Sequence, residues 1–168
     1  KPEVPYGSDI RGCLVASSDD TELCGSDMSG LEDRLKQHFI YPYDPDYVAA
    51  LNSVGYDPHL DIAVLAGGIT EEESKWYKEV NGYSDAQQVE FFKTNPEKKN
   101  EFKRLKTLRS IFKNGNYACQ YGAGIPRLMI TCGISREDAT KLHKAYWDRN
   151  WAIKAVSRDA RVKTVDGQ

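Results

Sequence analysis

Apolar residues recur at the spacing of a half-buried helix in the stretch Arg104–Gly124. On a helix they form one stripe, made of Leu105, Leu108, Ile111 and Phe112. The stretch ends in Tyr121-Gly122-Ala123-Gly124, where glycine can adopt the positive φ that stops a helix. The pattern predicts a helix that packs with one face and leaves its other face to polar side chains.

Capping residues and apolar periodicity predict further helices along the chain. Gly67-Gly68 should end the helix that begins near Leu60, and Thr70-Glu71-Glu72-Glu73 resembles a capping box that opens the next one. We expect helices over 30–40, from about Pro45, over 60–65, from Thr70 to about Val80, over 84–92, from about Pro96 through the stretch above, and, capped by Ser135, in one long element over 136–162.

Two short apolar runs near the N-terminus have a different pattern. Ile10–Ser17 and Thr21–Met28 are joined by the turn Ser18–Asp20, which predicts an antiparallel β-hairpin. Asp27 would then stand at the end of a strand, beside the start of a helix. The predicted fold class is α+β, mainly α, with residues 1–40 as one part and the helical residues 41–168 as the other.

Composition is that of an ordinary globular chain of 168 residues, and no apolar run approaches the length of a transmembrane span. We therefore expect no membrane partner. The four cysteines form no CxxC pair and have no histidine at metal-binding spacing, and with no secretory signal we expect reduced core thiols in a cytoplasmic protein. The chain begins with Lys1, and we expect it to be a piece of a longer polypeptide.

Basic charge is concentrated along the central helix, although the net charge of the chain is -2. The segment Lys98–Lys113 holds seven Lys or Arg against one acid, Glu101. Arg109, Lys113 and Tyr117 follow at i, i+4 and i+8, and would fan over about 80° and span about 12 Å. Such spacing is often only a solvated helix face, but two cations and a phenol in a row suit a nucleoside triphosphate.

The string RxxxKxxxYxxxYG over Arg109–Gly122 resembles motif B, the fingers-helix motif of the family A DNA polymerases. This group includes bacterial polymerase I and many phage replicative enzymes, so the resemblance implies a protein of the bacterial cell or of a phage. This resemblance implies that Arg109, Lys113 and Tyr117 bind the incoming deoxynucleotide (dNTP) and that Lys113 also acts in catalysis. It assigns Tyr121 and Gly122 to the DNA template.

The string SDMSGLEDR resembles motif A of the same family, and without that resemblance Asp27 would be taken for a turn residue. Asp27, Ser29, Glu32 and Arg34 match the pattern. The resemblance implies that Asp27 and the Met28 carbonyl bind metal, with Asp27 catalytic, and that Glu32 excludes a ribose 2'-hydroxyl. Arg34 is assigned to DNA.

The family also has an Asp-x-His element between these motifs, and its histidine contacts the incoming triphosphate. Asp57 and His59 match this element. A lone histidine after a proline is more often a cap or a surface residue. The connection from His59 to Arg109 is also longer than is usual in the family. We expect an insertion at about 66–97, which serves as a fingers elaboration, a docking surface or, by default, packing.

The resemblance therefore predicts part of a palm with its β-hairpin, followed by the helical fingers, of a DNA-directed DNA polymerase that uses two Mg²⁺ ions. Two-metal phosphoryl transfer needs a second carboxylate, which in the family comes from a His-Asp in motif C, and no His-Asp occurs in this sequence. The expected partners are primer-template DNA, dNTP and a remaining polypeptide with motif C and the thumb, so the chain should be inactive alone.

Two other functions stay open. The chain could be a noncatalytic nucleic-acid-binding or assembly module derived from polymerase fingers. A single-subunit RNA polymerase fragment is the weaker alternative, because that group places Met-Thr near the position of Tyr117 and because Glu32 favours deoxyribonucleotides.

Overall fold

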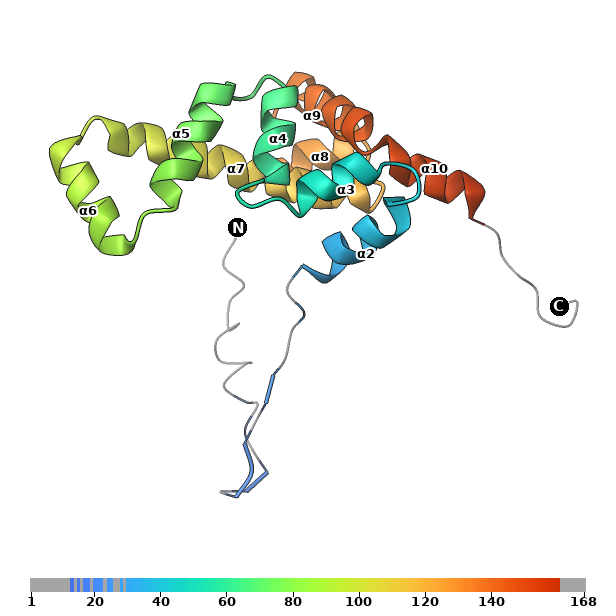
Figure 1. Cartoon of the computed structure of the whole chain (residues 1–168), viewed down its shortest axis with the longest axis horizontal. Coiled ribbons are helices and arrows are strands. Elements are labelled where there is room, and N and C mark those ends of the chain that lie inside the picture. The colour runs from blue at the N-terminus through green and yellow to red at the C-terminus, as the bar shows by residue number, and fades with distance from the viewer. Residues whose placement is uncertain are drawn as a thin grey trace, which may run out of the picture. The chain divides into compact units, whose positions relative to one another are not determined.

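A computed structural model describes residues 30–160 without a break and, before them, residues 13, 15, 17–18, 20–22, 24–25 and 28. The chain divides into two compact units, Lys1–Arg34 and Leu35–Gln168. In the second unit the described secondary structure consists of helices joined by short turns (Figure 1). No helix in the described part of the chain is both long and apolar enough to cross a membrane.

The helices begin close to where capping residues predict. The hydroxyls of Thr70 and Ser84 each accept a hydrogen bond from the backbone N–H three residues later. In return the side chains of Glu73 and Gln87 accept from the backbone N–H of Thr70 and Ser84, which completes a capping box at both positions. The described elements are α2 (Leu31–Ile40), α3 (Pro45–Leu51), α4 (Pro58–Leu65), α5 (Glu71–Asn81), α6 (Asp85–Thr94), α7 (Lys98–Gln120), α8 (Ile125–Cys132), α9 (Arg136–Arg149) and α10 (Trp151–Asp159).

The predicted β-hairpin is wrong, and with it the α+β fold class. The described residues within 10–28 are turns, bends and irregular backbone, with no strand among them. Their apolar side chains find no covering surface, since Val15 is 74% and Met28 63% exposed. A two-stranded hairpin without a packed face is marginal in water, so a pattern of apolar runs does not suffice to form one.

The single long helix predicted after Ser135 is two helices. α9 ends at Arg149, and Asn150 leaves helical geometry with φ -102° and ψ 33° before α10 begins. The Asn150 side chain is buried and its Nδ2 donates to the Tyr146 carbonyl at 3.0 Å. The same carbonyl also accepts from the Asn150 backbone N–H at 2.8 Å. Asparagine is a weak helix former whose side chain bonds to nearby backbone, so it suits the position between two helices.

The second half of α7 is the centre of the helical core, where α4, α8 and α9 pack around it (Figure 1). Leu105 and Phe112 are buried as the apolar stripe predicts, while Leu108 and Ile111 are half-buried. α7 ends at Gln120, and Gly122 follows with φ +79°. The stripe and its glycine stop are therefore confirmed.

At the other end of the helical unit, α5, α6 and the first half of α7 meet (Figure 1). Aromatic side chains hold this end together. The ring of Phe102 stacks on Tyr77 at 5.2 Å and lies 5.3 Å from Phe92 and 6.3 Å from Trp76. Glu73 of α5 also forms an ion pair with Arg104 of α7. The segment predicted as an insertion thus supplies α5 and α6, which pack onto α7.

Burial divides the cysteines into two kinds. Cys119 is buried and Cys132 half-buried between α7 and α8, as the prediction of core thiols requires. Cys13 and Cys24 are exposed, and for them that prediction is wrong.

Candidate functional site

Three predicted nucleotide-binding residues lie on α7 in the order that the sequence gives. Arg109 and Tyr117 are half-buried, and Lys113 between them is exposed. Since α7 is continuous from Lys98 to Gln120, the three side chains share one rigid support. Lys113 forms no ion pair with any residue in the described part of the chain.

The carboxylate of Asp57 joins the start of α4 to α7. One oxygen, Oδ1, accepts from the backbone N–H of His59 at 2.9 Å and of Leu60 at 3.2 Å, which caps α4. The other oxygen, Oδ2, accepts from Nε of Arg109 at 2.6 Å. Asp57 therefore fixes the helix start and the guanidinium of Arg109 at once.

His59 lies against the next turns of α7 and is only 8% exposed. Its Nδ1 is 3.0 Å from Nδ2 of Asn116, and its ring centroid is 5.8 Å from that of Tyr117. Asn116 Nδ2 also donates to the Pro58 carbonyl at 3.3 Å. The Oδ1 atom of Asn116 is buried and has no hydrogen-bond partner among the described residues.

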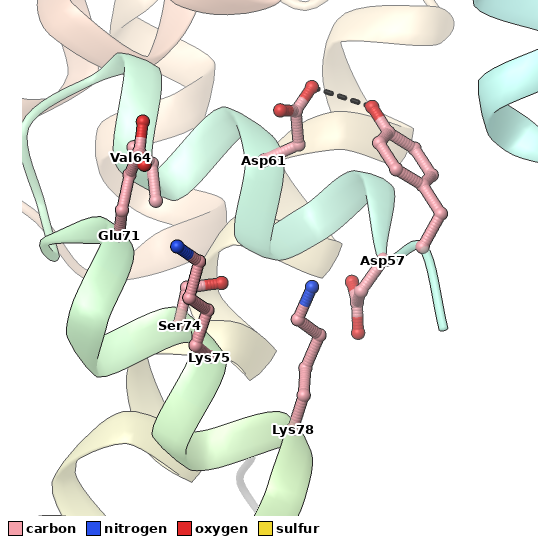
Figure 2. A pocket seen from close by; sticks show the side chains of 8 residues that line it. Asp57, Asp61, Val64, Glu71, Ser74, Lys75 and Lys78 are labelled. Atoms are coloured by element: carbon pink, nitrogen blue, oxygen red, sulfur yellow. Dashed lines mark hydrogen bonds between the residues drawn. The ribbon is translucent and has the colours of Figure 1, made fainter. Parts of the chain in front are cut away.

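A polar pocket of about 190 Å³ lies between α4 and α5, beside Asp57 (Figure 2). Lys78 and Lys75 project from α5 toward α4, and Lys78 points at the Asp57 carboxylate (Figure 2). The predicted insertion therefore lines a pocket next to the Asp57–Arg109 pair. Its complete lining is Tyr56, Asp57, Asp61, Val64, Glu71, Ser74, Lys75 and Lys78.

Asp61, on the other wall of this pocket, connects α4 to α9. Its Oδ2 accepts from the Tyr56 hydroxyl at 2.6 Å and from Nε of Arg149 at 3.3 Å. Burial, and then the hydrogen bond to Asp61, raise the pKa of Tyr56 well above its usual range. The guanidinium of Arg149 also stacks over the Tyr47 ring at 3.7 Å, so it braces α3 and α4.

The predicted template contacts stand at the C-terminal end of α7. Tyr121 is the residue after the helix and is 73% exposed, and Gly122 takes the left-handed turn behind it. The helix end thus presents an exposed ring four residues beyond Tyr117.

The predicted motif A residues belong to the first unit. Asp27, assigned as metal ligand and catalytic carboxylate, lies outside the described residues, as does Ser29. Met28 is exposed, and Glu32 and Arg34 are exposed in the first turn of α2. Among the described residues no cluster of His, Cys, Asp or Glu could hold a metal ion.

Sequence reasoning missed Asn116 and Arg149. Asn116 directly precedes Tyr117 and falls on the inward side of α7, at 7% exposure, so an amide on the buried side of an amphipathic helix was the available signal. Arg149 carried no signal, because its partners Asp61 and Tyr47 lie in distant segments. In comparisons with protein-family models, curated proteins and solved structures, nothing matched this chain.

Proposed function

We propose that this chain is part of a template-directed DNA polymerase of the family A type, and that α7 and the start of α4 form its dNTP-binding face. The observation that carries the proposal is the meeting of two elements 52 residues apart: Asp57 pairs with Arg109. Beside this pair, His59 lies against Asn116 and Tyr117. The Asp-x-His element and the basic helix were assigned to one nucleotide from sequence alone, and a shared site requires that they be neighbours.

Arg109 is suited to hold the outer phosphate. A guanidinium has five N–H donors in a planar fork, and Asp57 engages the one on Nε. The terminal nitrogens then provide charge-assisted hydrogen bonds to phosphate oxygens, in an orientation set by Asp57. In this role Asp57 is a positioning residue.

Lys113 is suited to act nearer the reacting phosphate. Its ammonium is exposed and unpaired in the described part of the chain, one helical turn from Arg109. A cation there stabilises the charge that develops on the leaving pyrophosphate and has a proton to give as the bond breaks. Tyr117, one turn further, offers its ring to the sugar and base.

The resemblance assigns two Mg²⁺ ions to the complete enzyme, held by Asp27, the Met28 carbonyl and a carboxylate from outside this sequence. When bound, such ions stabilise the attacking and leaving oxygens of the displacement. Asp27 lies outside the described residues, and the roles of Arg109, Lys113 and Tyr117 follow from their own positions on α7.

A binding experiment tests the face directly. The chain should bind a fluorescent dATP analogue, and Arg109→Ala should weaken this binding by roughly 10- to 100-fold, the value of a charge-assisted hydrogen bond. Lys144→Ala on α9 removes an equal charge and should leave the affinity unchanged. Equal affinity of the Arg109→Ala variant and the unmodified chain would refute the nucleotide site.

Reconstitution tests the enzyme. Combined with a polypeptide that carries motif C and the thumb, the chain should extend a primer, and Asp27→Ala should abolish extension. Nucleic-acid binding without dNTP binding or extension would instead identify a noncatalytic module.

A further inference from the structure

The cations of α7 fall into two groups once their partners are known. Three of the seven are paired with carboxylates: Lys98 with Glu101 at 3.0 Å, Arg104 with Glu73, and Arg109 with Asp57 at 2.6 Å. The other four form no ion pair within the described part of the chain and are all exposed. They are Lys99, Lys103, Lys106 and Lys113.

These four unpaired lysines, here called the lysine row, lie on one line along the helix. At about 100° and 1.5 Å per residue they fall within about 80° of the helix circumference and extend over about 21 Å. The side of α7 that carries these lysines is well away from the side that carries the buried Leu105 and Phe112. The row is therefore a linear array of positive charge that faces solvent.

Within α7 the lysine row is flanked by hydrogen-bonding groups without negative charge, while α6 places Asp85 in a pocket that Lys99 also lines. Glu101 is the one acid in α7, and it is occupied by Lys98. The other exposed side chains of the helix between Lys99 and Lys113 are neutral and polar or already paired, and they include Asn100, Thr107 and Ser110. With no acid of α7 beside them, Lys103, Lys106 and Lys113 form a run of positive charge that attracts polyanions.

We propose that the lysine row binds the phosphate backbone of a single-stranded nucleic acid. A single row of cations follows one strand, and the exposed ring of Tyr121 at the far end of α7 offers a surface for base stacking. A basic track combined with an aromatic ring is the arrangement by which proteins hold single strands without sequence preference. Most of the row lies N-terminal to Arg109, beyond the proposed dNTP contacts, and the proposal does not rest on the polymerase assignment.

Fluorescence anisotropy with a labelled oligothymidylate tests the row on the full chain. For single strands, log K falls with log salt by about 0.7 for each phosphate neutralised. The double variant Lys103→Ala, Lys106→Ala should therefore bind more weakly and reduce the salt slope by about 1.4. Lys141→Ala, Lys144→Ala on α9 has the same spacing, and its lysines are paired with Glu137 and Asp148, so its slope should be unchanged.

Several outcomes would overturn the proposal. Equal loss in the two double variants would show a nonspecific charge effect. Tighter binding of a duplex, or of polyglutamate, than of the oligothymidylate would assign the row to another partner. An unchanged salt slope in Lys103→Ala, Lys106→Ala would also overturn it. This variant should keep its binding of the dATP analogue, and loss of that binding together with the expected fall in slope would count against the proposed nucleotide site alone.

Discussion

The side-chain amide of Asn116 donates to Nδ1 of His59 at 3.0 Å and to the carbonyl oxygen of Pro58 at 3.3 Å. An amide nitrogen only donates, so Nδ1 of His59 must accept, and the proton of the neutral ring is placed on Nε2. The Pro58 carbonyl fixes which end of the amide faces the imidazole. Asn116 thus sets the tautomer of His59.

Nuclear magnetic resonance of the ring nitrogens tests this assignment. Nitrogen-15 spectra of the unmodified chain should show His59 protonated at Nε2. Asn116→Asp replaces the donor with a carboxylate acceptor, so the proton should move to Nδ1. Asn116→Leu removes the amide and should cost about 1–3 kcal/mol of stability through the unsatisfied groups that it leaves. The same tautomer in the unmodified and Asn116→Asp proteins would contradict the assignment.

A second prediction concerns the pair between Asp57 and Arg109. Asp57→Ala should lower stability more than Arg109→Ala, because Asp57 also caps α4. The double variant should be less destabilised than the sum of the two single changes, because each single change leaves one charge without its partner and the double variant leaves none. Urea unfolding monitored by circular dichroism gives the three values, and strict additivity would show that the pair contributes nothing.

Lys113 and Arg109 should differ in kinetics on the reconstituted polymerase. Lys113→Ala should lower the single-turnover rate while nucleotide affinity stays near normal, because the ammonium acts on charge that develops in the transition state. Arg109→Ala should mainly weaken affinity. A normal chemical rate in Lys113→Ala would show that Lys113 has no catalytic role and acts only within the lysine row.

Sugar selection provides a fourth prediction, which rests on the resemblance. Glu32→Ala in the reconstituted enzyme should raise incorporation of ribonucleotides relative to deoxyribonucleotides. Tyr117→Phe should make termination by dideoxynucleotides less efficient while its ring contact with His59 is kept. Competition assays on one primer measure both ratios, and an unchanged ribonucleotide ratio would remove Glu32 from the site.

Thiol chemistry gives a test of the core. Burial, with a smaller effect from the neighbouring Cys132, raises the pKa of the Cys119 thiol to about 12. Only the thiolate is alkylated, so at pH 8 Cys119 should resist iodoacetamide until urea unfolds the chain. The exposed Cys13 and Cys24 should react in the folded protein, and mass spectrometry of peptides separates the sites. Early modification of Cys119 would contradict the packing of α7 on α8.

Local signals predicted the helices well because they are properties of neighbouring residues. The capping boxes at Thr70 and Ser84 and the positive φ after α7 need only a few positions of sequence. The placement of Arg109, Lys113 and Tyr117 on one helix has the same origin. The sequence predicted that Asp57 and His59 share a site with this helix, but it could not provide the direct contacts, such as the ion pair of Asp57 with Arg109, because these form only through the packing of α4 on α7.

The errors have the opposite cause. The apolar runs around Val15 and Cys24 have the composition of strands, but a strand is stable only when another surface covers it, and none does among the described residues. The break falls at Asn150, whose buried side chain donates a hydrogen bond to the Tyr146 carbonyl, and no period of apolar residues reveals it. Both outcomes were decided by tertiary contacts.

At Gly115, α7 lies in close contact with Leu142 of α9. A methyl group placed on Gly115 would lie 2.6 Å from Cδ1 of Leu142. Leu142 therefore occupies the space that a side chain at position 115 would need. This contact sits between Lys113 and Tyr117 on the inward side of the helix. A hinge in that part of α7 would open a void in the core. Any displacement of the proposed nucleotide face would therefore move α9 together with α7 as one rigid unit.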